Sequence, residues 1–396
     1  MELNPIQAAI QKRQEAGLRI NNLSFADFTF YDTLLSKGKI QNAFANLFKY
    51  PYYYPTAKGE LEARQAIVEY YKHQDQEIDP ESLILTSSIN QSYLYLFKLF
   101  SSAGGKIIIP SPNTPVLQEV AGFLGIELQT YPLLADQNWQ IDLNALEKSI
   151  NRQTKAIFLM SPHLPTGAIQ KEETLRRLAK LIKGKNIALI VDESLADFIF
   201  KKQKLPLISA LMRADQLVIS LQTLSNSFAL PGLKLSWIQV SGPANQAKPL
   251  LQKLEFLADT FLTINQVSQA ILPEIVRHSH RWRKRFQAIV EKNSRTIIKR
   301  LGKSPQLRFH HPEGGFYAFI ELLDEHGQSN TQPNADQNFS LQLLKQTGIY
   351  IHPGHYYSQK TGCYFMLCFL QDPKTLRISC KNLLKFLKNN FTPLNP

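Results

Sequence analysis

The stretch "IALIVDESLADF", residues 187–198, decides the fold class, because a continuous apolar run stops at two carboxylates, Asp192 and Glu193. An apolar run of this length without polar alternation is typical of a strand that is buried on both faces of a sheet. Five similar runs, separated by helical patterns, lie between residues 80 and 241. They are "LILT" (83–86), "KIIIP" (106–110), "AIFLM" (156–160), "QLVISL" (216–221) and "LSWIQV" (235–240). This alternation predicts an α/β fold with a mostly parallel sheet that helices cover on both faces.

Polar loops follow several of these strands. They are "TSSINQ" (86–91), "PSPNTP" (110–115), "SPHLPTG" (161–167), "VDESLADF" (191–198) and "LQTLSNSFALPG" (221–232). In an open parallel sheet, ligands bind outside the carboxyl ends of the strands. We therefore expect the five loops to converge on one pocket.

The last third of the chain has a different pattern. Charged helical sequence from about residue 244 to 300 leads to strand-like runs at 305–322, 348–354 and 364–370, with a helix near 337–346 and a closing helix "PKTLRISCKNLLKFLKNN" (373–390). This order predicts a smaller α+β domain. We expect residues 1–45 to form an N-terminal arm and part of this domain, residues 46–285 the large domain, and residues 286–396 the small domain.

Composition limits the classes of function. The net charge is +13, and the basic residues fall in short clusters such as "KKQK" (201–204) and "RWRKR" (281–285) without a repeating aromatic pattern. Charged, solvated helix faces explain such clusters, so nucleic acid is not expected as a partner. Three cysteines without paired spacing predict neither a disulfide framework nor a metal site. The amino end lacks the pattern of an export signal and no run of eighteen apolar residues occurs, so we expect a cytoplasmic protein without a membrane span.

Several segments together resemble the class I/II aminotransferases, which use pyridoxal 5'-phosphate (PLP) on the transferase fold of type I. They are "YPTAKGELEARQAIVEYY" (54–71), "SPHLPTG" (161–167), "VDESLADFIF" (191–200), "LSNSFALPGLKLSW" (224–237), "HPEGGFYAFIEL" (311–322) and "IHPG" (351–354). The resemblance covers nearly the whole chain. It implies a large domain with a mostly parallel sheet of the seven-stranded type, a smaller α+β domain, and a homodimer with pockets at the subunit boundary.

The resemblance also implies a role for individual positions. Asp192 matches the carboxylate that pairs with the pyridine nitrogen of PLP, and Tyr54 matches a tyrosine that reaches the phosphate across the dimer. Thr223 and Ser225 match small hydroxyl positions around the phosphate. Asn226 stands where the family has the lysine that forms the Schiff base, and an amide is not a useful nucleophile.

Other matched positions depart from the family. Lys234 replaces the arginine that clamps the phosphate, and a lysine binds an anion as a point charge instead of a fork. Leu164 and Leu195 replace the asparagine and tyrosine that contact the ring hydroxyl, Thr114 replaces the stacking aromatic, and Ser88 replaces a glycine near the phosphate. Counting from Pro353-Gly354 puts Met366 at the position of the arginine that binds the substrate carboxylate, although Arg377 in "LRISC" superficially looks like that motif.

These departures favour a protein that has lost PLP-dependent transamination. We expect no cofactor, or PLP at most as a weak, non-covalent ligand, and no metal. The first hypothesis is a PLP-independent biosynthetic enzyme that uses acid-base chemistry for a cyclisation, isomerisation or condensation. Its catalytic candidates are Asp192, His163, Tyr54 and Lys234.

Two alternatives stay open. One is a non-catalytic binding or regulatory protein, and the other is a PLP-dependent aminotransferase of amino acids that uses Lys234 or another lysine. The expected ligand is a small molecule that is partly apolar or anionic. Its predicted contacts are Tyr54, Thr114, Leu164, Leu195, Asn226 and Met366.

Overall fold

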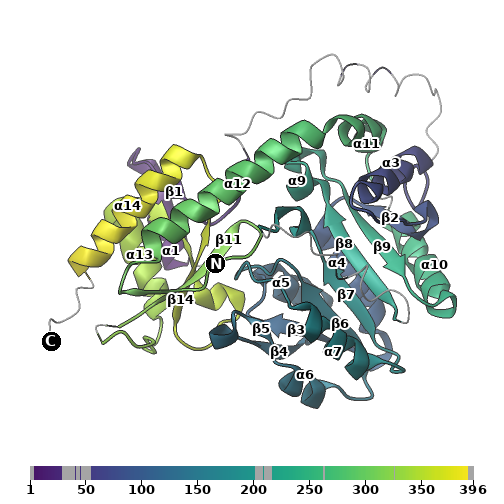
Figure 1. The fold of residues 1–396 in the computed structure, drawn as a ribbon, viewed down its shortest axis with the longest axis horizontal. Coiled ribbons are helices and arrows are strands. Elements are labelled where there is room, and N and C mark those ends of the chain that lie inside the picture. Colours follow the sequence, from purple (N-terminus) through teal and green to yellow (C-terminus); the bar gives the residue numbers. More distant parts are fainter. Residues whose placement is uncertain are drawn as a thin grey trace.

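In a computed structural model of the chain, two sheets carry the fold (Figure 1). The structure describes residues 4–28, 55–200, 216–261, 264–324 and 326–390, with the single positions 41, 45 and 208. The large sheet has eight strands in the order β2 (Leu83–Thr86), β9 (Ser236–Ser241), β8 (Val218–Thr223), β7 (Ala188–Asp192), β6 (Thr154–Met160), β3 (Lys106–Ser111), β4 (Gln129–Leu134) and β5 (Gln140–Ile141). The predicted α/β class and its mostly parallel sheet are confirmed, since β8, β7, β6, β3 and β4 pair in parallel.

Two of the eight strands, β4 and β5, were not predicted from the sequence. β4 has the sequence "QTYPLL", with Pro132 inside it and exposed positions between buried ones, so it lacks a continuous apolar run. β5 has only two residues and pairs with β4 at the edge of the sheet. A short or half-exposed edge strand gives no apolar run to recognise.

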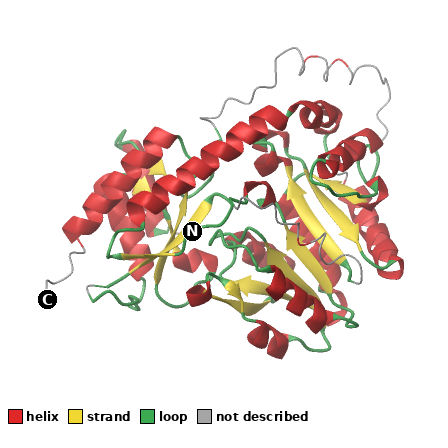
Figure 2. Cartoon of the chain, in the orientation of Figure 1, coloured by secondary structure: helices red, strands yellow, loops and turns green. Residues whose placement is uncertain are grey.

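Side-chain alternation explains why helices cover both faces of the large sheet. Leu189 and Val191 of β7 belong to one buried cluster, while Ala188 and Ile190 belong to the other. The helical elements associated with this sheet are α3 (Leu61–Lys72), α4 (Ile89–Phe100), α5 (Pro115–Leu124), α6 (Leu143–Ser149), α7 (Glu172–Ile182), α9 (Leu224–Ser227), α10 (Ala244–Phe261) and α11 (Gln266–His278) (Figure 2). Because neighbouring residues of a strand point to opposite faces, an unbroken apolar run needs cover on both.

The smaller sheet is antiparallel, with the order β10 (Leu307–Phe309), β11 (Tyr317–Leu322), β14 (Cys363–Cys368) and β13 (His352–Pro353). Beside it, β1 (Asn21–Asn22) pairs in parallel with β12 (Ile349–Tyr350). The helices on this side are α1 (Pro5–Glu15), α12 (His280–Leu301), α13 (Ala335–Thr347) and α14 (Pro373–Asn390). The expected boundary at residues 285 and 286 lies inside the continuous helix α12, and the division into domains stays a prediction.

Helix α12 extends from the large sheet to the small one (Figure 1). Near its start, Arg283 donates to the carboxylate of Asp197 at 2.7 Å and to the carbonyl of Ser227 at 3.1 Å. Near its middle, Asn293 donates to the carbonyls of Phe369 and Gln371, just before α14. None of the helices in the described part of the chain is long and apolar enough to cross a membrane.

Candidate functional site at the carboxyl edge of the large sheet

Strand register gathers polar side chains at one edge of the large sheet. Thr86 at the end of β2 pairs with Ser236 at the start of β9, and Ser236 pairs in turn with Thr223 at the end of β8. Asp192 ends the next strand, β7, and pairs with Met160 at the end of β6. The ends of β2, β6, β7 and β8 therefore lie at one edge of the sheet, while the convergence of their loops on one pocket stays a prediction.

Asp192 is a buried carboxylate of this edge, with 1% of its surface exposed. One carboxylate oxygen accepts from the backbone N–H of Ser194 at 2.8 Å, and the other accepts from the hydroxyl of Tyr93 on α4. Burial raises the pKa of Asp192, although the bonds from Ser194 and Tyr93 oppose that effect. No Lys, Arg or His among the described residues forms an ion pair with it.

Hydroxyl groups surround the two short helix starts beside Asp192. The Ser236 hydroxyl donates to Thr223 Oγ1 at 2.9 Å, and the same oxygen accepts from the backbone N–H of Ser225 as the N-cap of α9. Ser88 is the N-cap of α4, where its hydroxyl accepts from the backbone N–H of Gln91 at 3.2 Å. Hydroxyls and backbone N–H groups at a helix start suit an anion such as a phosphate.

Helix α9 carries Asn226, which is half-buried. No hydrogen bond of its side-chain amide to another described residue is present. Lys234 follows the turn at Pro231–Leu233, where its backbone takes the left-handed conformation with φ of 49° and its side chain is exposed. Lys234 is the lysine of the loop that connects β8 and β9.

The loop after β6 holds His163 and Leu164. His163 is buried, and its Nδ1 lies 2.9 Å from the Thr166 hydroxyl. Burial lowers the pKa of His163 to about 3, so the ring is neutral at ordinary pH and is a poor proton donor there. Leu164 is half-buried, and its backbone N–H points to the sulfur of Met160 at 3.2 Å.

The remaining predicted positions lie in different surroundings. Thr114 is the N-cap of α5 but makes no capping bond with its side chain. Leu195 is buried, and a Cβ added at Gly315 would lie 3.2 Å from its side chain, so the residue packs against the start of β11. Tyr54 lies outside the described residues.

Met366 and Arg377, the two candidates for the position of the carboxylate-binding arginine, lie in different surroundings, since Met366 is buried and Arg377 is exposed. Met366 lies in β14, pairs with Phe319 and His352, and is 1% exposed. Arg377 lies on α14, is exposed, and donates to the carbonyl of Pro373 at 3.1 Å. Arg377 therefore belongs to the surface of the closing helix, as its place in an amphipathic pattern predicted.

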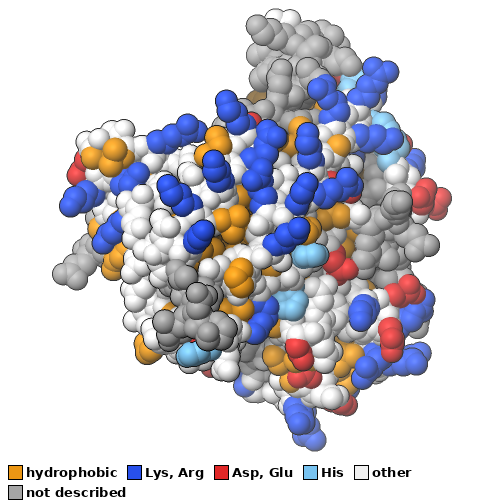
Figure 3. Space-filling model, turned by 60° about the vertical axis from the view of Figure 1, so that its left-hand side comes forward, with side chains coloured by type: hydrophobic (Ala, Val, Ile, Leu, Met, Phe, Trp, Pro, Cys, Tyr) orange, Lys and Arg blue, Asp and Glu red, His pale blue; other side chains and the backbone are white. Residues whose placement is uncertain are grey.

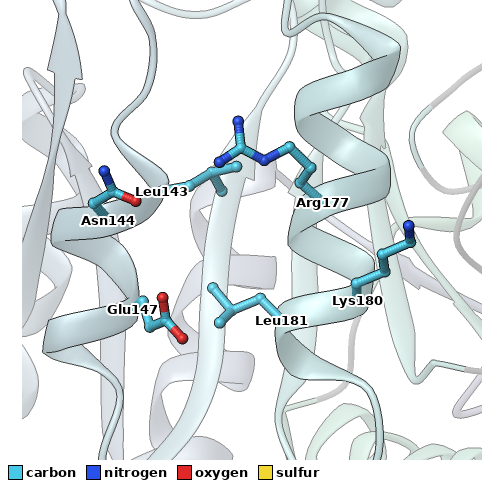
Figure 4. A pocket seen from close by; sticks show the side chains of 6 residues that line it. All are labelled: Leu143, Asn144, Glu147, Arg177, Lys180 and Leu181. Carbon is cyan, nitrogen blue, oxygen red and sulfur yellow. The ribbon is translucent and has the colours of Figure 1, made fainter.

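Two surface cavities lie away from this edge. Figure 4 shows the first, a groove of about 330 Å³ between α6 and α7 whose wall includes Glu147, Arg177 and Lys180. The second, of about 600 Å³, is lined by residues around the ends of β3 and β4 together with Ser358 and Lys360. Neither contains Asp192 or α9, so the chemistry of the edge does not depend on them. Among the described residues, no group of three or more His, Cys, Asp and Glu side chains is arranged to hold a metal ion.

Sequence reasoning missed three polar residues of the edge, namely Tyr93, Ser236 and Thr86. Tyr93 lies inside the apolar pattern of α4, which gives no local signal of a polar role. Ser236 precedes the apolar part of β9, and Thr86 was expected at the edge only as the first residue of the loop 86–91, without a role of its own. The pairing of β2 with β9 could have revealed the last two, but an antiparallel partner so distant in sequence leaves no local signal.

Comparison with known proteins agrees with the fold and the edge. The sequence model of the family "Aminotransferase class I and II" matches residues 17–384. The chain belongs to this family. It is 22% identical to the tyrosine aminotransferase of Bos taurus over 98% of this chain and 87% of that protein. It is 26% identical to the aspartate aminotransferase of Pyrococcus horikoshii over 85% of this chain and 83% of that protein.

Solved structures give the same fold. An alanine aminotransferase from Pyrococcus furiosus superimposes with a TM-score of 0.87 at 22% identity, covering 97% of this chain and 96% of that one. An aspartate aminotransferase from Thermotoga maritima has a TM-score of 0.83 at 19% identity, covering 98% of both chains. The predicted transferase fold of type I is thereby confirmed.

The functional expectation drawn from the altered positions is wrong. The relatives are named as aminotransferases, which supports PLP-dependent transamination and overturns the loss of that activity, the PLP-independent enzyme and the non-catalytic protein. The expectation of no cofactor, or of PLP only as a weak ligand, fails for the same reason. The error came from adding lost contacts one by one, while the buried carboxylate and the hydroxyl-bearing helix starts of the edge were given too little weight.

The donor set of the edge fits the two ends of PLP. A buried carboxylate without a cation suits a protonated pyridine nitrogen, and hydroxyls at two helix starts suit a phosphate. Asn226 offers no amine for a bond to the cofactor. The described residues therefore fit recognition of the ring nitrogen and the phosphate of the group.

Proposed function

We propose that the chain is a PLP-dependent aminotransferase that acts on amino acids, with Asp192 as the anchor of the cofactor ring. The observation that supports this proposal most strongly is a buried carboxylate that is held by neutral donors alone at the carboxyl edge of the sheet. A bound pyridinium would supply the missing positive charge. PLP, when bound, supplies a carbonyl that combines with amino groups and a ring that stabilises negative charge on the neighbouring carbon.

Each polar residue of the edge then has a task. Asp192 orients the ring and keeps its nitrogen protonated, while Tyr93 and Ser194 hold the Asp192 carboxylate in place. Thr223 and Ser225, with the start of α4 at Ser88, bind the phosphate. His163 is buried and neutral, so we assign it to the support of its loop through Thr166.

We further propose that Asn226 occupies the position of the lysine that forms the Schiff base in this family. An amide neither forms that bond nor takes up the proton from the substrate's α carbon. We assign both tasks to Lys234, which follows α9 after one tight turn and has an exposed side chain. Tyr54 is proposed to reach the phosphate of the neighbouring subunit.

The substrate class follows from the apolar replacements. Leu164 and Leu195 flank the Asp192 loop, and Met366 leaves no charge at the position equated with the carboxylate-binding arginine. We therefore propose an amino acid with a bulky, partly apolar side chain, and contacts from Thr114 and Asn226 at the same site. The named relatives act on tyrosine, aspartate and alanine according to their names, which gives three donors to compare.

A second copy of the chain is the proposed partner, in the cytoplasm. Large apolar side chains are exposed on three helices beside the large sheet, with Phe256 exposed by 71% and Phe261 by 58% on α10, Leu61 by 44% on α3 and Val267 by 38% on α11. Exposed apolar groups of this size favour an interface. Cys363, Cys368 and Cys380 are free and buried, which is compatible with a reducing compartment. A monomeric mass by light scattering contradicts the dimer.

Titration with PLP tests the main proposal. We expect the wild-type chain to bind PLP with a new absorbance band, and Asp192→Asn to bind it at least tenfold more weakly because the ring nitrogen loses its carboxylate. Transamination of tyrosine with a 2-oxo acid acceptor should exceed that of aspartate. A chain that ignores PLP at millimolar concentration overturns the function.

Reduction with borohydride and peptide mapping test the lysine separately. We expect the cofactor to be trapped on Lys234 in the wild type, to be lost in Lys234→Met, and to remain in Lys171→Met as a control on the surface before α7. In Asn226→Lys the adduct should move to residue 226. Tight PLP binding without an adduct on Lys234 rejects its role and leaves the proposal for Asp192 intact.

A further inference from the structure

Two neighbouring helices carry almost all of the net charge of the chain. α12 and α14 together contain thirteen Lys and Arg residues and one acidic residue, Glu291. Subtracting these from the 45 basic and 32 acidic residues of the chain leaves 32 and 31 for everything else. The excess of +13 is therefore a property of one surface and not of the whole molecule, contrary to the dispersed distribution that the sequence suggested.

The basic residues of α14 form a single stripe. Lys374, Arg377, Lys381, Lys385 and Lys388 follow one another at intervals of three or four residues, and all five are exposed. Residues at this spacing lie on one face of a helix. The opposite face contains Leu376, Leu383 and Phe386 among its buried residues, so the stripe points to solvent because the helix buries its apolar side.

Helix α12 continues the same surface. Seven of its eight Lys and Arg side chains are exposed, and the exception, Arg283, is paired with Asp197. The two helices pack against each other: Asn293 of α12 donates to the two carbonyls that precede α14, and the charge of Arg300 acts on Cys380 of α14. Figure 3 shows this side of the molecule with many Lys and Arg side chains and few acidic ones among them.

We propose that this basic ridge, made of the exposed Lys and Arg of α12 and α14, binds the phosphate backbone of a double-stranded nucleic acid. α12 has 22 residues and is thus roughly 33 Å long. That length matches about one turn of a duplex, which carries one negative charge for roughly every 1.7 Å of its axis. The seven exposed cations of α12 and the five of α14 together give one positive charge for roughly every 2.8 Å of that length, which is lower than the charge density of the duplex but of the same order.

The composition of the ridge sets the mode of binding. Its large aromatic residues, Trp282, Phe286 and Phe386, are all buried, so no aromatic ring of the two helices is offered to stack on unpaired bases. Contact is therefore made to phosphates and does not read sequence. A membrane surface fits less well, because Ile378 is the large apolar side chain that these helices expose. An amphipathic helix that binds a bilayer instead presents its apolar face.

Fluorescence polarisation with labelled duplexes of 25 base pairs tests this proposal on the full chain, with DNA and RNA duplexes measured separately. The variant removes three charges of α14, by Arg377→Gln, Lys381→Gln and Lys385→Gln. The matched control removes three charges of α7, by Arg176→Gln, Arg177→Gln and Lys180→Gln. We expect the α14 variant to bind at least tenfold more weakly at 100 mM salt and the α7 variant to stay within twofold.

Salt dependence and competing ligands complete the experiment. Each lost phosphate contact should reduce the slope of log affinity against log salt by about 0.9, so the α14 variant should lose up to about 3 from the slope. Equal losses in both variants, or binding to vesicles with 30% phosphatidylserine but to neither duplex, overturn the proposal. Single strands that bind as tightly as duplexes also contradict it. Circular dichroism checks that both variants remain folded.

Discussion

Two buried aspartates five residues apart, Asp192 and Asp197, differ in whether a cationic side chain pairs with them. Asp192 accepts from the hydroxyl of Tyr93 and from the backbone N–H of Ser194, and has no cationic partner among the described residues. Asp197 accepts from the Arg283 guanidinium at 2.7 Å and from the hydroxyl of Tyr70 at 3.1 Å. Both carboxylates lose water, but only one is neutralised by the chain itself.

This difference separates structure from function within one loop. Arg283 also lies over the rings of Tyr70, at 4.9 Å, and Phe228, at 4.7 Å, so the pair around Asp197 fastens α12 to α3 and α9. Asp192 has no cationic partner among the described residues, so burial of its carboxylate raises its pKa. A buried charge without a partner is costly, and a ligand that brings the partner gains affinity from that cost.

The largest expected effect comes from breaking the paired aspartate. Arg283→Ala should lower the free energy of unfolding by about 3 to 5 kcal/mol, because Asp197 is left as a buried charge without a counterion. Urea denaturation measures the change. Arg295→Ala on the same helix is the control, since its pair with Glu291 is exposed and should contribute about 0 to 1 kcal/mol. Similar losses in both variants mean that the Arg283 pair is no more important than a surface pair.

The second prediction concerns the charge of His163, because a protonated imidazole in this loop would be a candidate cation for Asp192. The pKa of His163 is lowered to about 3 by burial, so its folded form stays neutral while the unfolded form takes up a proton below about pH 6.5. Its contribution to stability is therefore complete above pH 6.5 and is lost as the pH falls toward 3.

His163→Asn removes this proton linkage but keeps a polar group near Thr166. Between pH 7 and pH 5 the wild type should lose about 2 kcal/mol more unfolding free energy than the variant. Urea curves at both values measure the difference. Parallel pH dependence in the two proteins implies that folded His163 takes up a proton as readily as the unfolded residue, and the contrast between the aspartates then weakens.

The sequence predicted the role of Asp192 at the strand end but not the pairing of Asp197 with Arg283. Asp192 was recognised because an apolar run ends at it and the family places a carboxylate there. Arg283 lay in "RWRKR" and looked like part of a solvated cluster, since nothing local separates one buried arginine from its exposed neighbours. Its role depends on the packing of α12 against residues 56 and 86 positions earlier in the chain, Ser227 and Asp197.

The candidate site divides in the same way. The strand ends and their loops could be predicted, because an apolar run marks its own carboxyl end. Tyr93 could not be assigned to the site, because a helix brings it there from a position 99 residues before Asp192, and Ser236 was not singled out although its partner Thr223 is 13 residues away. The equivalence of Leu164 and Leu195 with the ring-contacting residues of the family stays a prediction, whereas the loss of function inferred from it is wrong.

A smaller effect compares the two tyrosines that serve the aspartates. Tyr70→Phe and Tyr93→Phe each delete one buried hydroxyl that bonds a carboxylate, and each should cost about 1 to 3 kcal/mol of unfolding free energy. Only Tyr93→Phe should also weaken PLP binding, by several fold, because its target carboxylate is the proposed anchor of the cofactor ring. Paired urea and PLP titrations measure both quantities. Weaker PLP binding in Tyr70→Phe as well indicates a general loosening of the fold.

The smallest net change in stability is expected for Asp192→Asn, and its sign is informative. Burial raises the folded pKa of Asp192 above its unfolded value near 3.9, so its contribution to stability is complete below that value and is lost as the pH rises through the folded pKa. The amide does not titrate. The unfolding free energy of the variant should therefore rise relative to that of the wild type from pH 4 upward, and should equal or exceed the wild-type value at pH 7. Urea midpoints across this range test the prediction. Saturating PLP should reverse the order, because the cofactor stabilises the folded wild type more strongly than the variant. A large loss of stability in Asp192→Asn without PLP, of the size expected for Arg283→Ala, shows instead that the chain neutralises Asp192 itself.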